Sequence, residues 1–183
     1  VPVALYMQWV AEDGRGGGGA VGGWSRQIGI EHWGSIHGLA HRTHFEVSDT
    51  ASREGGFGFS DVKPNFAYEH GIYKTGYRYR GRVMGHSGDG DTLSYSIGST
   101  LVQSAGPVWN VLLRYMEINR VGSPDSRHTL SPTPQDMFDV QISHDRMTRF
   151  GRFGAGIGYS RIDDQATASS DSGGFGFIQW SSN

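Results

Sequence analysis

Residues 73–91, with the sequence YKTGYRYRGRVMGHSGDGD, alternate two chemistries with a period of two, and this alternation constrains the fold more than any other feature. Successive side chains of a β-strand point to opposite faces, so a strand here has two unlike faces. One face carries Arg78, Arg80, Arg82 and His86, and the other carries Tyr77, Tyr79, Gly81, Val83 and Gly85. A soluble sheet would bury the tyrosines and expose the arginines to water. A membrane barrel would turn the tyrosines toward lipid and the arginines toward an aqueous lumen.

The composition is compatible with the barrel. Only 36% of the 183 residues are hydrophobic. No apolar run approaches the roughly 18 residues of a membrane-spanning helix, which excludes a helical membrane protein. Barrel strands need only about 9–11 residues, of which half can be polar. A net charge of −2 gives no reason to expect a nucleic-acid partner, and the absence of cysteine removes disulfides and thiol catalysis.

Alternating runs recur along the whole chain, and no amphipathic helix or linker interrupts them. About nine runs are clear, whereas outer-membrane barrels have an even number of strands and alternate long outer with short inner connections. A weak tenth strand within residues 54–66 restores both features. We therefore expect an all-β, antiparallel transmembrane β-barrel of about ten strands. Residues 1–183 would form a single barrel domain or the C-terminal part of one.

The same pattern predicts where the connections lie. Long outer connections are expected at residues 13–23, 49–53, 88–91, 119–135 and 163–173. Short inner connections are expected around Ser35, Glu69, Gly106 and Thr148. The segment at residues 73–91 would then rise from the inner side and reverse outside the cell, with its arginines in the lumen and its tyrosines at the lipid interface.

Several stretches of the first half resemble the Wzi capsule assembly family of outer-membrane proteins in Gram-negative bacteria. The most specific is GYRYRGR at residues 76–82, followed by GHS at residues 85–87. The other matching stretches are residues 3–6, Gln8, Glu12, Asp13, Glu46, Asp49, Thr50, residues 68–71, Tyr73 and residues 89–91. The second half matches only in its strands and turns.

The resemblance implies a large barrel in the bacterial outer membrane, surrounded by lipid and lipopolysaccharide. It implies a lectin-like protein, neither an enzyme nor dependent on a cofactor, that attaches capsular polysaccharide to the cell surface. Family members are considerably longer, so the chain looks like a C-terminal portion with further strands elsewhere.

Many capsular polymers are acidic, and guanidinium groups offer planar, bidentate donors to carboxylates. The arginines of residues 73–91 are therefore candidates for polymer binding, or for a luminal network that neutralises carboxylates in the barrel. The residues expected in one role or the other are Arg78, Arg80, Arg82, His86, Asp89, Asp91, Glu12, Asp13, Glu46 and Asp49. Tyr73, Tyr77, Tyr79 and Trp109 are candidates for sugar stacking, but an interfacial aromatic girdle is favoured.

The sequence gives weaker indications of metal sites. His37, His41 and His44 have helical metal-ligand spacing, but in a strand His41 and His44 point to opposite faces. The acidic pairs Glu12–Asp13 and Asp89–Asp91 supply oxygen ligands without completing a calcium loop. We therefore assign no metal.

Three other functions stay open. An outer-membrane porin with an arginine-lined lumen is the first. A lipid hydrolase is the second, because His86–Ser87 and Ser143–His144–Asp145 contain the residue types of a catalytic triad. Neighbours on one strand cannot reach one bond from the same face, so partners would have to come from other strands. A soluble β-sandwich is the third.

Overall fold

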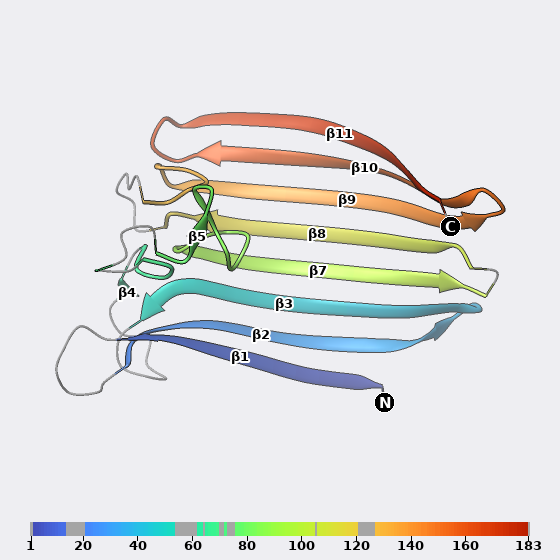
Figure 1. Ribbon diagram of the computed structural model, residues 1–183, viewed down its shortest axis with the longest axis horizontal. Helices are drawn as coiled ribbons and strands as arrows, with labels where there is room; N and C mark the ends of the chain where they lie inside the picture. The colour runs from blue at the N-terminus through green and yellow to red at the C-terminus, as the bar shows by residue number, and fades with distance from the viewer. Residues whose placement is uncertain are drawn as a thin grey trace.

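The computed structural model describes residues 2–13, 21–53, 62–63, 65–69, 72, 76–104, 106–120 and 127–182, and all regular structure in them is β. Nine strands form one antiparallel sheet, and two short strands form a separate hairpin (Figure 1). The strands are β1 (Val3–Asp13), β2 (Val21–Ile36), β3 (Leu39–Arg53), β4 (Val62–Lys63), β5 (Arg78–Tyr79), β6 (Arg82–Val83), β7 (Thr92–Gln103), β8 (Val108–Ile118), β9 (Gln135–Thr148), β10 (Gly151–Asp164) and β11 (Ser169–Ser181). The described residues contain no helix that is long and apolar enough to cross a membrane.

The long strands follow each other across the sheet in chain order, β1-β2-β3-β7-β8-β9-β10-β11. Residues 37–38, 104–107 and 149–150 connect them at one end, which we call the short-turn end. Residues 14–20, 54–91, 119–134 and 165–168 connect them at the other, the long-connection end. The prediction of an all-β antiparallel fold is confirmed, as are the short turns near Ser35, Gly106 and Thr148.

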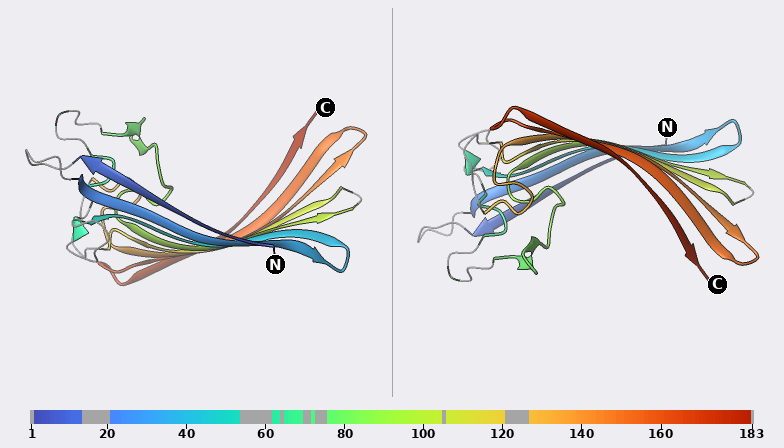
Figure 2. Two further views of the ribbon diagram at one scale, coloured as in Figure 1. Left: turned by 90° about the horizontal axis from the view of Figure 1, so that it is seen from below. Right: turned by 90° about the horizontal axis from the view of Figure 1, so that it is seen from above.

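The prediction of a strand in the barrel wall is wrong for two segments. Residues 76–91 do not cross the sheet but form the β5–β6 hairpin, which stands off one side at the long-connection end (Figure 2). In the predicted tenth strand only β4 is regular, and it pairs with just two residues of β3, while residues 54–61 lie outside the described part. The predicted outer connection at residues 49–53 is instead the last part of β3, and Glu69 lies in a long connection rather than in a short one.

One face of the sheet is apolar. A cross-strand row of paired residues runs over seven strands through Leu5, Ile30, Phe45, Ile97, Leu113, Val140 and Tyr159. An aromatic row of Tyr95, Tyr115 and Phe138 lies beside it toward the long-connection end. Trp109, Phe153 and Trp180 lie on the same face toward the short-turn end. Most of these side chains are exposed, so the face has an aliphatic band between two aromatic bands, as the outside of a membrane barrel does.

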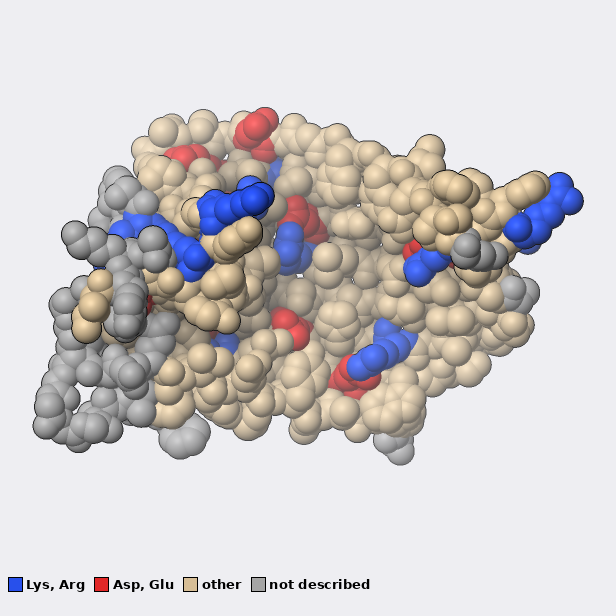
Figure 3. All heavy atoms as spheres, viewed as in Figure 1, with Lys and Arg blue, Asp and Glu red and all other residues tan. Residues whose placement is uncertain are grey.

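The opposite face is polar. The adjacent cross-strand row, one residue closer to the long-connection end, contains Tyr6, Gly29, Glu46, Ser96, Arg114, Asp139 and Ser160. The Tyr6 hydroxyl donates to Glu46 at 2.9 Å, and Arg114 pairs with Asp139 at 2.6 Å. Figure 3 shows such charged groups scattered over the face that is viewed in Figure 1. Adjacent rows of opposite character are the pattern of a barrel wall between lipid and a polar interior.

Gly29 lets Tyr6 reach Glu46, because a Cβ at Gly29 would overlap the Tyr6 ring. Replacing Gly29 with alanine should therefore destabilise the sheet by about 1–3 kcal/mol, the usual cost of overpacking. Gly173 on β11 is the matched control, since a Cβ there meets no atom within 4 Å. Denaturant unfolding of both variants measures the difference. Equal stability of the two variants would contradict this role of Gly29.

Candidate functional site

Polar residues, several of them buried, gather at the long-connection end of the sheet and join two separate connections to it. We define the cap network as Asp49, Arg78, Asp89, Asp91, Arg120 and Thr129. Asp49 comes from β3, and Arg78, Asp89 and Asp91 come from the connection between β3 and β7. Arg120 and Thr129 come from the connection between β8 and β9. The network therefore fastens two long connections to the sheet.

Asp49 is held by two arginines. Its Oδ1 accepts from Arg120 at 2.5 Å and its Oδ2 from Arg26 at 3.3 Å. The same Arg120 guanidinium lies 3.5 Å from Asp91, which has no exposed surface. Two carboxylates with two guanidinium groups compensate each other's charge, which buried ions require.

Asp89 connects the two long connections directly. Its carboxylate accepts from the backbone N–H of Thr129 at 2.6 Å and from the Thr129 hydroxyl. Its own carbonyl accepts from the Thr50 hydroxyl at 2.5 Å, and Thr50 follows Asp49 on β3. Asp89 has a positive φ of 68°, a conformation that aspartate tolerates better than most residues. These contacts fix the chain just before β7.

Arg78 belongs to the buried network, with a side chain that is only 16% exposed. Its guanidinium contacts Glu69 at 2.6 Å and donates to the carbonyl of Arg127 at 2.9 Å. Asp89 lies 3.8 Å from the same group. The planar fork of arginine suits this arrangement, because it can reach several acceptors at once.

The β5–β6 hairpin displays the rest of the predicted arginine row. Arg78 pairs with Val83 and Tyr79 with Arg82 across a two-residue turn. The turn residues Arg80 and Gly81 have φ of 49° and 79°, as a type I′ turn requires. Because the chain reverses here, the row is split: the Arg78 side chain is largely covered, whereas Arg80 and Arg82 are exposed.

Aromatic side chains accompany the exposed arginines. Tyr77 is 60% exposed and Tyr79 is 62% exposed. The Arg80 guanidinium lies 5.3 Å from the centre of the Tyr79 ring, within the range of a cation–π contact. We call Tyr77, Tyr79, Arg80 and Arg82 the hairpin tip. It combines flat apolar rings with cations that are open to solvent.

Tyr68 clamps the base of the hairpin. Its carbonyl accepts from the N–H of Tyr77 at 2.9 Å, and its hydroxyl accepts from the N–H of His86 at 3.0 Å. The ring lies against Gly85, where a Cβ would overlap it. The chain thus enters and leaves the hairpin through the same residue, which positions the hairpin tip relative to the sheet.

His86 lies between the hairpin and the polar face. Its Nδ1 accepts from the N–H of Gly88 at 3.0 Å. Burial lowers the pKa of His86 below its ordinary value, while the nearby Glu46 raises the pKa and Arg114 lowers it. Since Glu46 and Arg114 both belong to the polar face, the connection folds back over that face of the sheet.

The structure brings together only part of the predicted set. Arg78 and Asp89 meet, Asp49 and Asp91 share Arg120, and His86 lies near Glu46. The single arginine-lined face is wrong, because Arg80 and Arg82 lie on the exposed hairpin tip. Glu12 and Asp13 end β1, and their side chains lie outside the described part. A network that neutralises carboxylates was predicted, but two of the arginines that pair with Asp49, Arg26 and Arg120, were not among the predicted residues.

The register of β2 against β3 could have identified one of these cations, Arg26. The short turn at residues 37–38 sets the pairing of β2 with β3, and that pairing places Arg26 opposite Asp49. Arg120, Glu69 and Thr129 lie in connections, whose paths the strand pattern does not determine. No sequence signal of that kind was available for them.

The weaker predicted sites are dispersed or incomplete. His41 hydrogen-bonds His32 at 3.0 Å, and His37 lies in a turn. His144 packs against Trp109 on the apolar face, with ring centres 4.4 Å apart, whereas Ser143 and Asp145 belong to the polar rows. Among the described residues, no group of three or more histidine or acidic side chains is arranged to hold a metal ion.

The cap network predicts a pH dependence through His128, which is buried beside it. Burial lowers the pKa of His128, although Asp89 and Asp91 act in the opposite direction. Below the ordinary histidine pKa of about 6.5, the unfolded chain binds this proton before the folded chain does. Stability should therefore fall as the pH drops below about 6.5 and stay unaffected by His128 above it. Denaturant unfolding between about pH 8 and pH 5 measures this, and a His128→Gln variant with the same pH dependence would contradict it.

Comparisons with known proteins agree with this architecture. The family model for capsule assembly protein Wzi matches residues 1–172. Among solved structures, the chain is similar to Wzi of Escherichia coli, an outer-membrane protein involved in group 1 capsule assembly and a carbohydrate-binding β-barrel. The TM-score is 0.73 at 22% identity, and the match covers 100% of this chain and 39% of the other. No curated protein matches.

Proposed function

Because the chain belongs to the capsule assembly protein Wzi family, we propose that it forms part of an outer-membrane β-barrel that holds capsular polysaccharide at the surface of a Gram-negative cell. The protein acts as a lectin and catalyses no reaction. The observation that carries this proposal is the hairpin tip, in which exposed tyrosines and arginines are presented by a buried network of ion pairs.

The two faces of the sheet support a place in the membrane. The apolar face, with its two aromatic bands, faces lipid, and the polar face with Glu46, Arg114 and Asp139 faces the barrel interior. Outer-membrane barrels have long connections outside and short turns in the periplasm. The long-connection end therefore faces the cell exterior, where the capsule lies.

The chemistry of the hairpin tip fits an acidic polysaccharide. Arg80 and Arg82 offer planar pairs of donors to carboxylates of the polymer. Tyr77 and Tyr79 offer ring faces for the apolar sides of sugars and hydroxyl groups for hydrogen bonds. A rigid hairpin loses little conformational freedom on binding, which favours affinity.

The remaining predicted residues support the hairpin tip. Arg78, Asp89 and Asp91, with Asp49, hold the connections in place, while His86 and Glu46 join the connection to the polar face. Glu12 and Asp13 remain predicted members of the same end of the barrel. In this role the acidic residues need no contact with the polymer, which their charge would repel.

Binding of purified capsular polysaccharide to the full-length protein tests this function. Replacing both Arg80 and Arg82 with alanine should weaken binding of an acidic polymer about tenfold or more, since hydrogen bonds to charged groups contribute about 1.5–3 kcal/mol each. Arg161→Ala is the matched control, because Arg161 is an exposed arginine at the same end but on the apolar face. Equal binding by the double variant and the control would overturn the assignment of the hairpin tip.

A further inference from the structure

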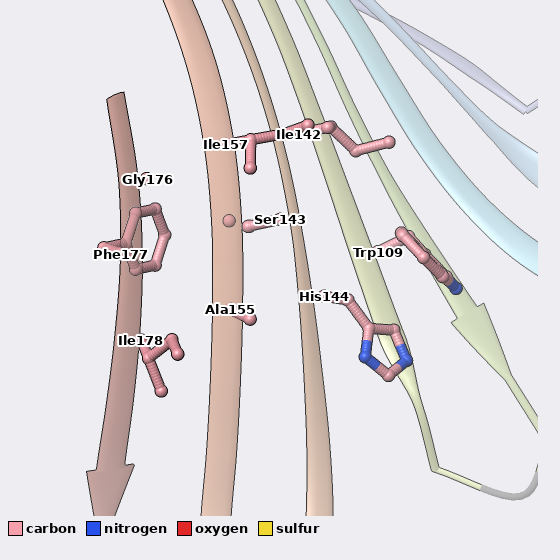
Figure 4. Close-up of a pocket in the computed structure, with 10 residues that line it drawn as sticks. Trp109, Ile142, Ser143, His144, Ala155, Ile157, Gly176, Phe177 and Ile178 are labelled. Carbon is pink, nitrogen blue, oxygen red and sulfur yellow. The ribbon is translucent and has the colours of Figure 1, made fainter. Parts of the chain in front are cut away.

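The apolar face contains a groove of about 700 Å³ near the short-turn end. In one cross-strand row Ala155 lies between His144 and Ile178, and in the next row Gly176 lies beside Ile157. The two small residues leave room between larger ones, so a depression opens in an otherwise filled surface. Figure 4 shows Trp109 and His144 on one side of Ala155 and Ile178 on the other.

Two arginines lie on the short-turn side of this groove. Arg146 follows His144 by two residues on β9, so it lies on the same face about 7 Å further along the strand. Arg149 is in the next turn, with its guanidinium 4.5 Å from the centre of the Phe150 ring. Within the described part of the chain, no carboxylate pairs with Arg146 or Arg149.

This distinguishes the two arginines from those of the polar face. There Arg42, Arg114 and Arg152 each pair with a carboxylate. A cation on an apolar barrel exterior lowers its energy by reaching the lipid headgroups, where phosphates supply the counter-charge. Arg146 and Arg149 are therefore available to an anion outside the protein.

We propose that the groove and these arginines form a binding site for one anionic phospholipid. An acyl chain lies in the groove over Ala155 and Gly176, and the phosphate is bound by Arg146 and Arg149. His144, at the headgroup end of the groove, donates a further hydrogen bond, and Phe153 and Trp180 belong to the aromatic band at the same depth.

The position of the site selects a phospholipid over lipopolysaccharide. In the proposed orientation, on which this inference rests, the short-turn end faces the periplasm. The inner leaflet there is made of phospholipids, whereas lipopolysaccharide occupies the outer leaflet. The polymer, bound at the hairpin tip, is at the opposite end of the strands. Loss of either site therefore leaves the other measurable.

Native mass spectrometry of the full-length protein, reconstituted with phosphatidylglycerol, phosphatidylcholine or lipopolysaccharide, tests the site. The wild type should retain one phosphatidylglycerol in preference to phosphatidylcholine. Replacing Arg146 and Arg149 with glutamine should reduce this retention about 30-fold, the effect of two cations at an anionic lipid surface. Ala155→Trp, which fills the groove, should reduce retention of both lipids without removing a charge.

Arg161→Gln is the matched control, because Arg161 lies on the same face at the opposite end of the strands. It should retain phosphatidylglycerol as the wild type does, and the strand content of every variant is checked by circular dichroism. Equal retention by the double variant would show nonspecific surrounding lipid only and overturn the proposal. Preferential retention of lipopolysaccharide would also overturn it. Polysaccharide binding should be unchanged in all these variants.

Discussion

Replacing Asp49 with alanine should destabilise the long-connection end by about 3–5 kcal/mol, the range for removing one partner of a buried ion pair. Asp49 is the shared acceptor of Arg26 and Arg120, so its loss takes one carboxylate away from two guanidinium groups. Asp91, which relies on the same Arg120, loses a correctly placed partner as well. Denaturant unfolding measures the loss of stability, and hydrogen exchange locates it.

Glu31→Ala is the matched control for this substitution. Glu31 also pairs with an arginine across two strands, at 2.7 Å, but the Arg42 side chain is 71% exposed. Water can replace the contact, so this variant should stay close to wild-type stability. Asp49→Asn, which keeps hydrogen-bond acceptance without the charge, should lie between the two. If Asp49→Ala is no less stable than Glu31→Ala, the cap network does not hold the long connections.

Replacing Arg78 with alanine should weaken polysaccharide binding as much as losing the exposed Arg80 and Arg82 does, although the Arg78 side chain is largely covered. Arg78 ties the hairpin to Glu69 and to the carbonyl of Arg127. Without these contacts the hairpin tip is no longer held in one place, and ordering it on binding costs affinity. The expected result is a loss of about tenfold or more in binding, together with faster hydrogen exchange in residues 77–84.

The second measurement separates positioning from direct contact. Arg82→Ala should weaken binding without changing hydrogen exchange, because Arg82 is on the exposed side of the hairpin. Arg78→Lys keeps the charge but not the planar fork, so it should restore only part of the protection. Normal hydrogen exchange in Arg78→Ala would contradict the anchoring role of this residue.

The long strands could be predicted from sequence because their two faces differ in polarity. In β3, β7 and β8 the alternation identifies the row through Phe45, Ile97 and Leu113 as apolar and the neighbouring row as polar. A slip of one residue would exchange the faces, so such a pattern specifies both strand and register. The short turns follow from the same runs, since little chain remains between them.

The hairpin could not be recognised in the same way. A two-residue turn keeps the alternation of residue types while it reverses the chain, so Arg78 and Arg82 end on different faces without any break in the pattern. The glycines at positions 76, 81, 85, 88 and 90 were the available warning, because glycine is unfavourable inside strands. Adding a weak strand within residues 54–66 preserved an even count, so the two errors compensated each other.

Within the candidate site, only the contacts that strand pairing determines could be predicted from the sequence. Asp49 and its partner Arg26 follow from the pairing of β2 with β3. The contacts of Asp89 with Thr129 and of Arg78 with Glu69 join segments whose positions depend on the folded connections. Such contacts require the three-dimensional structure, because loop paths carry no periodic signal.

Labelling of a single cysteine at the hairpin tip tests the central claim most directly. The 183 residues contain no cysteine, so Tyr79→Cys adds the one thiol of this chain, and the full-length protein without the substitution gives the background labelling. On intact cells lacking capsule, a membrane-impermeant maleimide should label it rapidly, and added capsular polysaccharide should slow the labelling. In an Ile157→Cys variant the thiol lies on the apolar face, so the same reagent should not label it with or without polymer. Failure to label Tyr79→Cys, or labelling that the polymer leaves unchanged, would contradict an exposed, polysaccharide-binding hairpin.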